Sequence, residues 1–380
     1  MHEEKIALVD GQVKAVQQAV AARAVENVYF VACGGSLATL YPGKYILERE
    51  TAAVSTGAYT AADVLNDSPR APGRKEPGGA QFPKRRHAGD RRGGTAGHRA
   101  RRADGGVHHH ARFGSGAGGG PYRLLLRRPA SPYPAVLTIF PEVYKLTYAL
   151  LDVWNGTGRL PEVNAAMLRL QDTFDEACAA YRPAARAFGA KYAGEPILYS
   201  IAAGLDACVG YVLTNCLVME SLWKHSSPLH AGEFFHGAFE AVDDTAAVFA
   251  LLGLGKTRAL EERAVKFLQR KTGKLTVLDA AALDLEAYPG WLRAPVSALV
   301  LNRLAALYCD EMSYAMGHPI SSRRYVGWKN TDEAAWHRRQ RAGRLPLAAG
   351  AVPAGQQRQC ARAGPPLRRK HSSLYRRAGR

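Results

Sequence analysis

Residues 28–45 read VYFVACGGSLATLYPGKY and contain a complete pattern of strand, turn and helix. The β-branched and aromatic run Val28–Ala32 is typical of a short buried strand, and a helical pattern follows from Leu37 to Glu48. Between the two, glycines let the backbone approach a phosphate, and the amide groups at the helix start point toward it. We therefore predict a substrate-binding turn, with a plain connection as the alternative, at Gly34, Gly35 and Ser36.

The same pattern recurs 170 residues later, where Tyr199–Gly204 parallels Tyr29–Gly34 and the helical stretch Leu205–Met219 follows. A long amphipathic helix precedes each copy, Gln12–Asn27 before the first and Val163–Tyr192 before the second. The repeat implies two similar α/β halves.

Strand and helix patterns continue to alternate after the second copy. Strands are predicted at Thr245–Leu252 and Lys274–Leu278, and helices at Thr257–Lys271 and Ala294–Met316. Alternation at these spacings is typical of parallel sheets with helices on both faces. We predict an α/β fold of two three-layer αβα sandwiches with parallel sheets, the first of them disrupted.

Positive charge is concentrated in two tracts. The chain has 51 Lys and Arg against 33 Asp and Glu, a net charge of +18. Ser68–Ala130 holds 15 basic residues against 3 acidic ones, and Arg323–Arg380 holds 15 against 2. The remainder therefore has 21 basic and 28 acidic residues, a net charge of −7, which argues against a specific nucleic-acid partner.

Both basic tracts lack a helical or strand period, so we expect them to build no core and to be disordered. Such composition arises when a G+C-rich gene is read out of frame, and patterned sequence returns abruptly at Pro134. A frameshift is our interpretation; a nucleic-acid-binding insert and a metal-binding tract at His108–His110 are alternatives. The predicted organisation is the start of a first domain at 1–67, an aberrant tract at 68–130, the rest of that domain with connecting helices at 131–190, a second domain at 191–325 and an aberrant tail at 326–380.

Length and composition fit a globular cytoplasmic protein. The 380 residues suffice for two domains, and no apolar run is long enough to span a membrane. The N-terminal residues MHEEKIALVDG lack the features of a signal peptide. The six cysteines form no CxxC pair and are interpreted as free thiols in a reducing compartment.

Residues 217–240 gather the densest set of proton-transfer groups in the chain. An apolar surrounding raises the pKa of a carboxyl and lowers that of an imidazole, which brings both toward neutrality, where acid–base catalysts work best. We predict proton-transfer chemistry here, with a solvated loop between helices as the alternative. The groups are Glu220, His225, His230, Glu233, His236 and Glu240.

Two possible nucleotide motifs are incomplete. Gly253-Leu254-Gly255 has Arg258 where a dinucleotide fingerprint has its third glycine. Gly255-Lys256-Thr257 follows a predicted strand, but Ala250 replaces the first glycine of a P-loop. An ATP site remains an alternative to a plain turn, and no cofactor is expected.

The strand-turn-helix at residue 28, its echo at Tyr199 and HAGEFFHGAFEAVDD (residues 230–244) together resemble the sugar isomerase (SIS) domain family. The resemblance is greatest to its fructosamine-6-phosphate deglycases, of the fructoselysine-6-phosphate type. Gly232–Glu240 is the most specific match, where relatives carry E-[FL]-x-H-G-x-x-E, and His318–Tyr325 resembles their C-terminal end. The likeness covers about 5–67 and 131–325.

The resemblance implies a catalytic pair, because Glu220 and His236 have the family's separation of sixteen residues. Glu220 would move the proton between C1 and C2 of the substrate, and His236 would act as the general acid for the departing amine. Glu233 would hold sugar hydroxyls or orient His236. The family also implies a phosphosugar substrate, no cofactor or metal, and a homodimer in which His236 serves the neighbouring chain.

One departure from the family is large. Its Ser/Thr-rich phosphate loop, of the S-x-S-G-x-T-x-E kind, should fall near residues 80–95, where nothing matches. The family's closing C-terminal end is also replaced after Tyr325. We therefore predict cofactor-independent cleavage of a fructosamine 6-phosphate to glucose 6-phosphate and an amine, impaired in this chain. Alternatives are an aldose-ketose isomerase or aminosugar-phosphate deaminase, and a non-catalytic phosphosugar-binding regulator.

Overall fold

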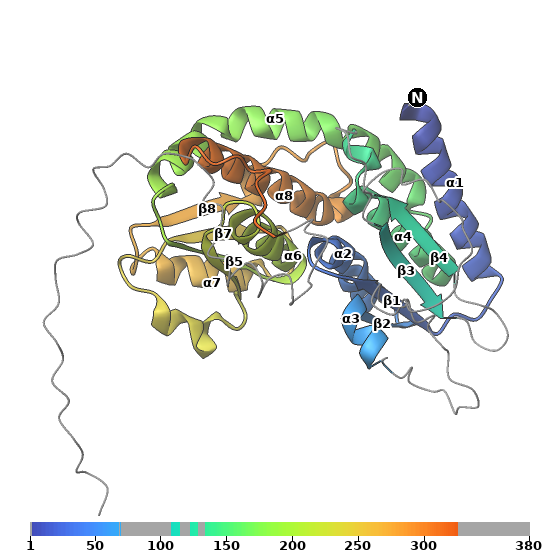
Figure 1. The fold of residues 1–380 in the computed structure, drawn as a ribbon. Helices are drawn as coiled ribbons and strands as arrows, with labels where there is room; N and C mark the ends of the chain where they lie inside the picture. Colours follow the sequence, from blue (N-terminus) through green and yellow to red (C-terminus); the bar gives the residue numbers. More distant parts are fainter. Residues whose placement is uncertain (1, 68, 70–107, 115–121, 128–133, 326–380) are drawn as a thin grey trace, which may run out of the picture. The chain divides into compact units, whose positions relative to one another are not determined.

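The computed structural model describes residues 2–67, 69, 108–114, 122–127 and 134–325. The described helices and strands lie in one compact unit, Met1–Arg323 (Figure 1). The predicted tail at 326–380 and most of the predicted tract at 68–130 lie outside the described residues. Among the described helices, none is both long and apolar enough to cross a bilayer.

The first sheet has the strand order β2-β1-β3-β4. β1 (Asn27–Ala32) confirms the predicted strand and pairs in parallel with β2 (Ser55–Thr60). However, β3 (His108–Gly114) is antiparallel to β1, and β4 (Tyr122–Arg127) is antiparallel to β3. The prediction of a parallel sheet is therefore wrong for this half, and no strand was expected within 68–130. Only seven residues separate β3 from β4, too few for the crossover that parallel strands need.

The second sheet confirms the predicted parallel arrangement, with the order β6-β5-β7-β8. Its strands are β5 (Ile197–Ala202), β6 (His225–His230), β7 (Val248–Leu252) and β8 (Leu275–Asp279). All five residues of β7 are buried, as expected of a strand covered on both faces. β6 escaped prediction because HSSPLH is polar and contains Pro228, which an edge strand tolerates.

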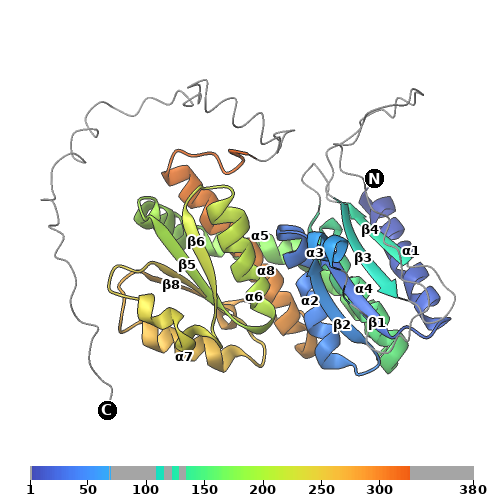
Figure 2. The same cartoon turned by 60° about the horizontal axis from the view of Figure 1, so that its bottom comes forward.

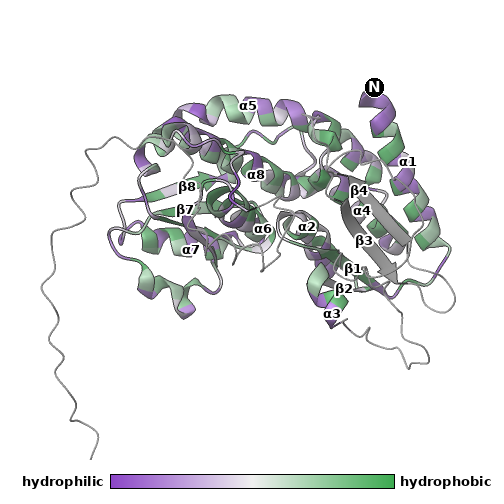
Figure 3. Ribbon diagram, in the orientation of Figure 1, coloured by the Kyte–Doolittle hydropathy of each residue, from purple (hydrophilic) through white to green (hydrophobic). Residues whose placement is uncertain are grey.

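Helices cover the second sheet on both faces (Figure 2). One apolar cluster packs α7 against β7, and a larger one packs the opposite face of the sheet against α5 and α8. Figure 3 shows the apolar colours along these strands, with hydrophilic residues on the outer side of α5. The helices are α1 (His2–Ala21), α2 (Gly35–Glu50), α3 (Ala61–Asn66), α4 (Ile139–Asn155), α5 (Leu160–Tyr192), α6 (Ala207–Tyr211), the π-helix η3 (Val212–Met219), α7 (Arg258–Leu268) and α8 (Gly290–Ala315).

The predicted repeat is visible in the backbone. Gly34 follows β1 with a φ of 57°, and Gly204 follows β5 with a φ of 54°. The helices after the two turns pack against each other, since a Cβ added to Gly35 would lie 3.0 Å from the Sγ of Cys216 and one added to Gly204 would lie 2.9 Å from the Oη of Tyr45. α2 therefore runs antiparallel to α6 and η3.

Candidate active site

The first glycine turn is open to solvent. Gly34 is exposed, with a φ of 57° and a ψ of −136°, and nothing lies within 4 Å of where its Cβ would be. The N–H of Ser36 donates to the carbonyl of Cys33 at 3.2 Å, which closes the turn. Among the described residues, no acceptor takes the N–H of Gly34 or of Gly35. The turn therefore offers free amides at the N-terminus of α2, an arrangement suited to an anion.

Glu220 stands close to this turn in the same chain. The π-helix η3 ends at Met219, and Cys216, which approaches Gly35, lies about one helical turn before Glu220. π-Helical segments are often found at functional sites. The structure thus brings the predicted anion-binding turn and the predicted base to the same end of the packed helix pair α2 and η3.

Residues after α8 contact the segment that carries Glu220. The Nε of Arg323 donates to the Oε1 of Glu220 at 3.0 Å, and His318 Nε2 lies 2.9 Å from the carbonyl oxygen of Ser221. The ring of His318 also meets that of Trp223 edge to face, at 4.4 Å between centroids. Trp223 has a φ of 59°, the only positive φ of a non-glycine residue in the described chain. Such strain is often held at functional sites.

His236 and Glu233 lie at the other edge of the second sheet. The amide of Ala231 donates to the carbonyl of Ala202 at the carboxyl end of β5, and the amide of His236 donates to the carbonyl of Glu233 at 2.9 Å. Glu220, in contrast, precedes the amino end of β6. Because β6 has six residues, the amino and carboxyl ends of this strand are about 17 Å apart. One chain therefore does not bring Glu220 and His236 together.

The single chain also lacks the expected apolar surrounding for these groups. The side chain of Glu220 is 41% exposed, and His236 and Glu233 are both exposed. This prediction is wrong for the isolated chain, because Glu220 follows the end of a helix and His236 lies on a short 3-10 turn at the sheet edge.

The second glycine turn is filled by the chain's own carboxylates. Glu261 on α7 accepts the N–H of Ala203 at 2.9 Å and that of Gly253 at 2.8 Å. Asp206 is 3% exposed, and its Oδ2 lies 1.9 Å from where a Cβ on Gly253 would be. Burial raises the pKa of Glu261 to about 7 and that of Asp206 well above its usual range, and the neighbouring Glu261 raises the latter further. Burial therefore favours the protonated form of both carboxyls.

Asp206 and Glu261 were not predicted from the sequence, because they are far apart in the chain and match no motif. The repeat could have indicated Asp206, since it aligns this residue with Ser36 of the first turn. The neighbouring segment has the features of a plain turn, since the amide of Gly253 is already taken by Glu261. Arg258, which breaks the dinucleotide pattern, is a structural residue that pairs with Asp279 through two hydrogen bonds of 2.7 and 2.8 Å.

The chain is similar in sequence to known deglycases. It is 31% identical over 339 residues to fructosamine deglycase FrlB of Bacillus subtilis, a match that covers 85% of this chain and 98% of the relative. A fructoselysine 6-phosphate deglycase of Escherichia coli O157:H7 is 32% identical over 132 residues, which is 35% of this chain and 37% of the relative. No protein-family model matches the chain.

Two crystal structures have a similar fold. A candidate phosphosugar isomerase of Bacillus subtilis superposes with a TM-score of 0.67 and 27% identity, covering 86% of this chain and 99% of the other. A second one, from Salmonella typhimurium, gives a TM-score of 0.65 at 20% identity over 84% of this chain and 98% of the other. The second match bears on the fold alone.

Proposed function

Because the chain belongs to the SIS-domain family of phosphosugar enzymes and is a homologue of fructosamine deglycases, we propose that its reaction is the cleavage of a fructosamine 6-phosphate to glucose 6-phosphate and a free amine or amino acid. The reaction needs no cofactor. Its substrate carries a ketone at C2 and an amine at C1, so that proton transfers alone convert it into an imine that water hydrolyses.

Glu220 is the general base in this proposal. It removes a proton from C1 to give the enaminol and returns a proton to C2, which forms the imine at C1. Water then adds to C1, and His236 protonates the nitrogen so that the carbon–nitrogen bond breaks and the amine leaves. Arg323 donates to Glu220 at 3.0 Å and holds its carboxylate in place.

The observation that carries the proposal is the close approach of Gly35, in the open turn, to Cys216, which lies about one helical turn before Glu220. The free amides of Gly34 and Gly35 can hold the substrate's phosphate there. His236 lies at the far edge of the same sheet, so the acid of each site must come from the second chain of a homodimer. Glu233, next to His236, would then reach the same sugar from the partner.

We also propose that this chain is a weak catalyst. No Ser/Thr-rich phosphate loop matches between residues 80 and 95, so the turn at Gly34 would hold the phosphate without its usual partner. Measuring glucose 6-phosphate release from several Amadori phosphates tests this proposal, and measuring fructose 6-phosphate isomerisation tests the alternative isomerase activity. Deglycase turnover at ordinary rates would refute the proposal that the chain is a weak catalyst. Binding of a phosphosugar without any turnover would favour a non-catalytic regulator.

Mixed dimers provide the sharper test. Glu220→Gln and His236→Asn should each lower the residual rate about 100-fold or more. If the site is shared across a two-fold axis, a re-equilibrated equal mixture of the two variants should recover about a quarter of the starting rate, because half of the dimers then hold one intact site. A mixture as inactive as its components would show that Glu220 and His236 do not combine between chains.

A further inference from the structure

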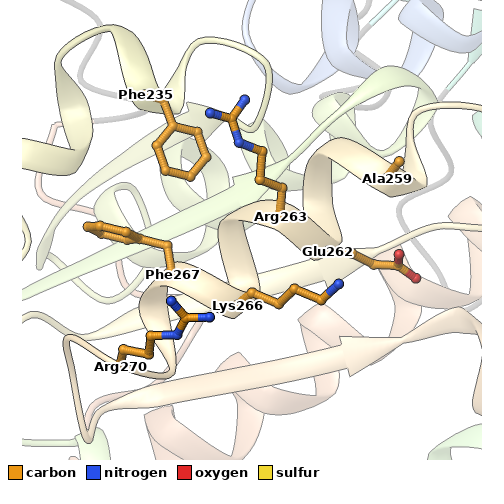
Figure 4. Close-up of a pocket in the computed structure, with 7 residues that line it drawn as sticks. All are labelled: Phe235, Ala259, Glu262, Arg263, Lys266, Phe267 and Arg270. Atoms are coloured by element: carbon orange, nitrogen blue, oxygen red, sulfur yellow. The ribbon is translucent and has the colours of Figure 1, made fainter.

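A pocket of about 430 Å³ lies between α7 and the segment that carries His236. Figure 4 shows the rings of Phe235 and Phe267 on one side of it, with the basic side chains of Arg263, Lys266 and Arg270 around them. The two rings meet edge to face, with centroids 5.6 Å apart. The remaining lining residues are Ala259, Glu262, Arg263, Lys266 and Arg270. The pocket therefore combines an apolar floor with a charged rim.

The rim is positively charged. Arg263 and Lys266 are three residues apart on α7, Arg270 follows two residues after the helix ends, and all three are exposed. Within the part of the chain that the structure describes, none of them pairs with a carboxylate. The one acid in the lining, Glu262, is paired with Arg258 at 2.8 Å, and Arg258 is also paired with Asp279. The lining therefore holds three cations against one carboxylate.

The spacing of these cations favours a ligand with more than one anionic group. Arg263 and Lys266 are about one helical turn apart on α7, and Arg270 lines the same pocket from the turn that follows the helix. Arg263 already lies over the Phe235 ring, 4.1 Å from its centroid, which fixes its guanidinium at the pocket's edge. A guanidinium binds phosphate through paired hydrogen bonds, and the positive edges of aromatic rings do not repel an anion.

We propose that this pocket is a binding site for small molecules that carry two adjacent phosphate groups. It is separate from the turn at Gly34 and does not depend on the proposed reaction. Because Phe235 lines it and His236 is the next residue, an occupied pocket would restrain the segment that presents the proposed acid.

Protection of Lys266 from chemical acetylation tests the site directly. The full chain is treated with an acetylating ester at constant ionic strength, with and without inorganic pyrophosphate, and each lysine is followed by mass spectrometry. Lys14, exposed on α1, is the internal reference that corrects for ion screening and for ions held by the basic tracts. We expect saturable protection of Lys266, and the concentration for half protection should rise about tenfold or more in the Arg263→Gln/Arg270→Gln variant. Arg186→Gln, an exposed position on α5, should leave it unchanged.

Adenosine diphosphate, whose phosphates are adjacent, is compared with fructose 1,6-bisphosphate, whose phosphates are at opposite ends of the sugar. Tighter protection by adenosine diphosphate supports the proposal and adds a base that the Phe235 and Phe267 rings accept, whereas tighter protection by fructose 1,6-bisphosphate would overturn the requirement for adjacent phosphates. Equal protection of Lys266 and Lys14, or protection that the double variant does not weaken, would overturn the proposal. So would protection that grows with protein concentration in the absence of pyrophosphate, because a second copy would then cover the pocket.

Discussion

The turn at Gly34 and the turn at Gly204 follow equivalent strands, and their glycines have nearly the same φ, 57° and 54°. Around Gly34 nothing stands within 4 Å of the missing side chain, whereas Gly204 is enclosed by Thr257 and Tyr45. The second turn also has a resident hydrogen-bond acceptor, because Glu261 accepts the amides of Ala203 and Gly253.

This difference shows how one repeated unit supports two roles. Backbone amides at the end of a parallel strand need a hydrogen-bond acceptor. In the second half Glu261 supplies it from within, which ties α7 to the ends of β5 and β7. In the first half the chain supplies none among the described residues, so the turn is free for the substrate phosphate that we propose. The fold repeat alone would have predicted two phosphate sites.

The largest expected effect comes from adding a methyl group to each turn. Gly34→Ala strains a positive φ and should cost about 1–3 kcal/mol. Gly204→Ala has the same strain, and its Cβ would also lie 2.3 Å from Thr257 Oγ1, which should add about 2 kcal/mol. Urea unfolding of both variants measures the two free energies. Thr257→Ala should recover most of the additional loss in Gly204→Ala, and equal losses in the two turns would contradict the comparison.

The next effect concerns the pH dependence of stability. Burial raises the pKa of Glu261 from 4.5 in the unfolded chain to about 7 in the folded one. Between these values the folded state holds more protons, so its stability should fall as pH rises from about 4.5 to 7, by about 3 kcal/mol at most. The raised pKa of Asp206 acts in the same direction. Urea unfolding at a series of pH values should show this fall.

Glu261→Gln should reduce the slope of that profile between pH 4.5 and 7, because one of the two groups no longer titrates. Its neighbour Glu262, whose side chain is 43% exposed in an ion pair with Arg258, is the matched control. Glu262→Gln should shift stability by less than about 1 kcal/mol and leave the slope in place. If both variants keep the slope of the parent, the filled turn is not the source of the pH dependence.

Local sequence patterns predicted the second half well. The buried run of β7 and the glycine turns have short-range signals, and the repeat located β5 from β1. β6 was not predicted because it is polar and contains Pro228, so it lacks the apolar pattern of a strand. β3 was not predicted because it pairs with β1, which lies far away in the sequence. Within the site, Gly35 and Glu220 come near each other because α2 packs against η3. The sequence pattern of either segment alone does not indicate this packing.

The smallest expected effect tests that packing contact. A Cβ on Gly35 would lie 3.0 Å from Cys216 Sγ, tight enough that one of the two must move. Gly35→Ala also gains helix propensity at the first residue of α2, so the net change in stability should be below about 1 kcal/mol. In a Cys216→Ala background the crowding disappears, and the same substitution should become stabilising, with a coupling of about 0.5–1 kcal/mol. Since Cys216 stands one turn before Glu220, the residual deglycase rate should fall in Gly35→Ala and return in the double variant. Independent, additive effects on stability would mean that α2 and η3 are not in contact here, and Glu220 would lose its link to the open turn.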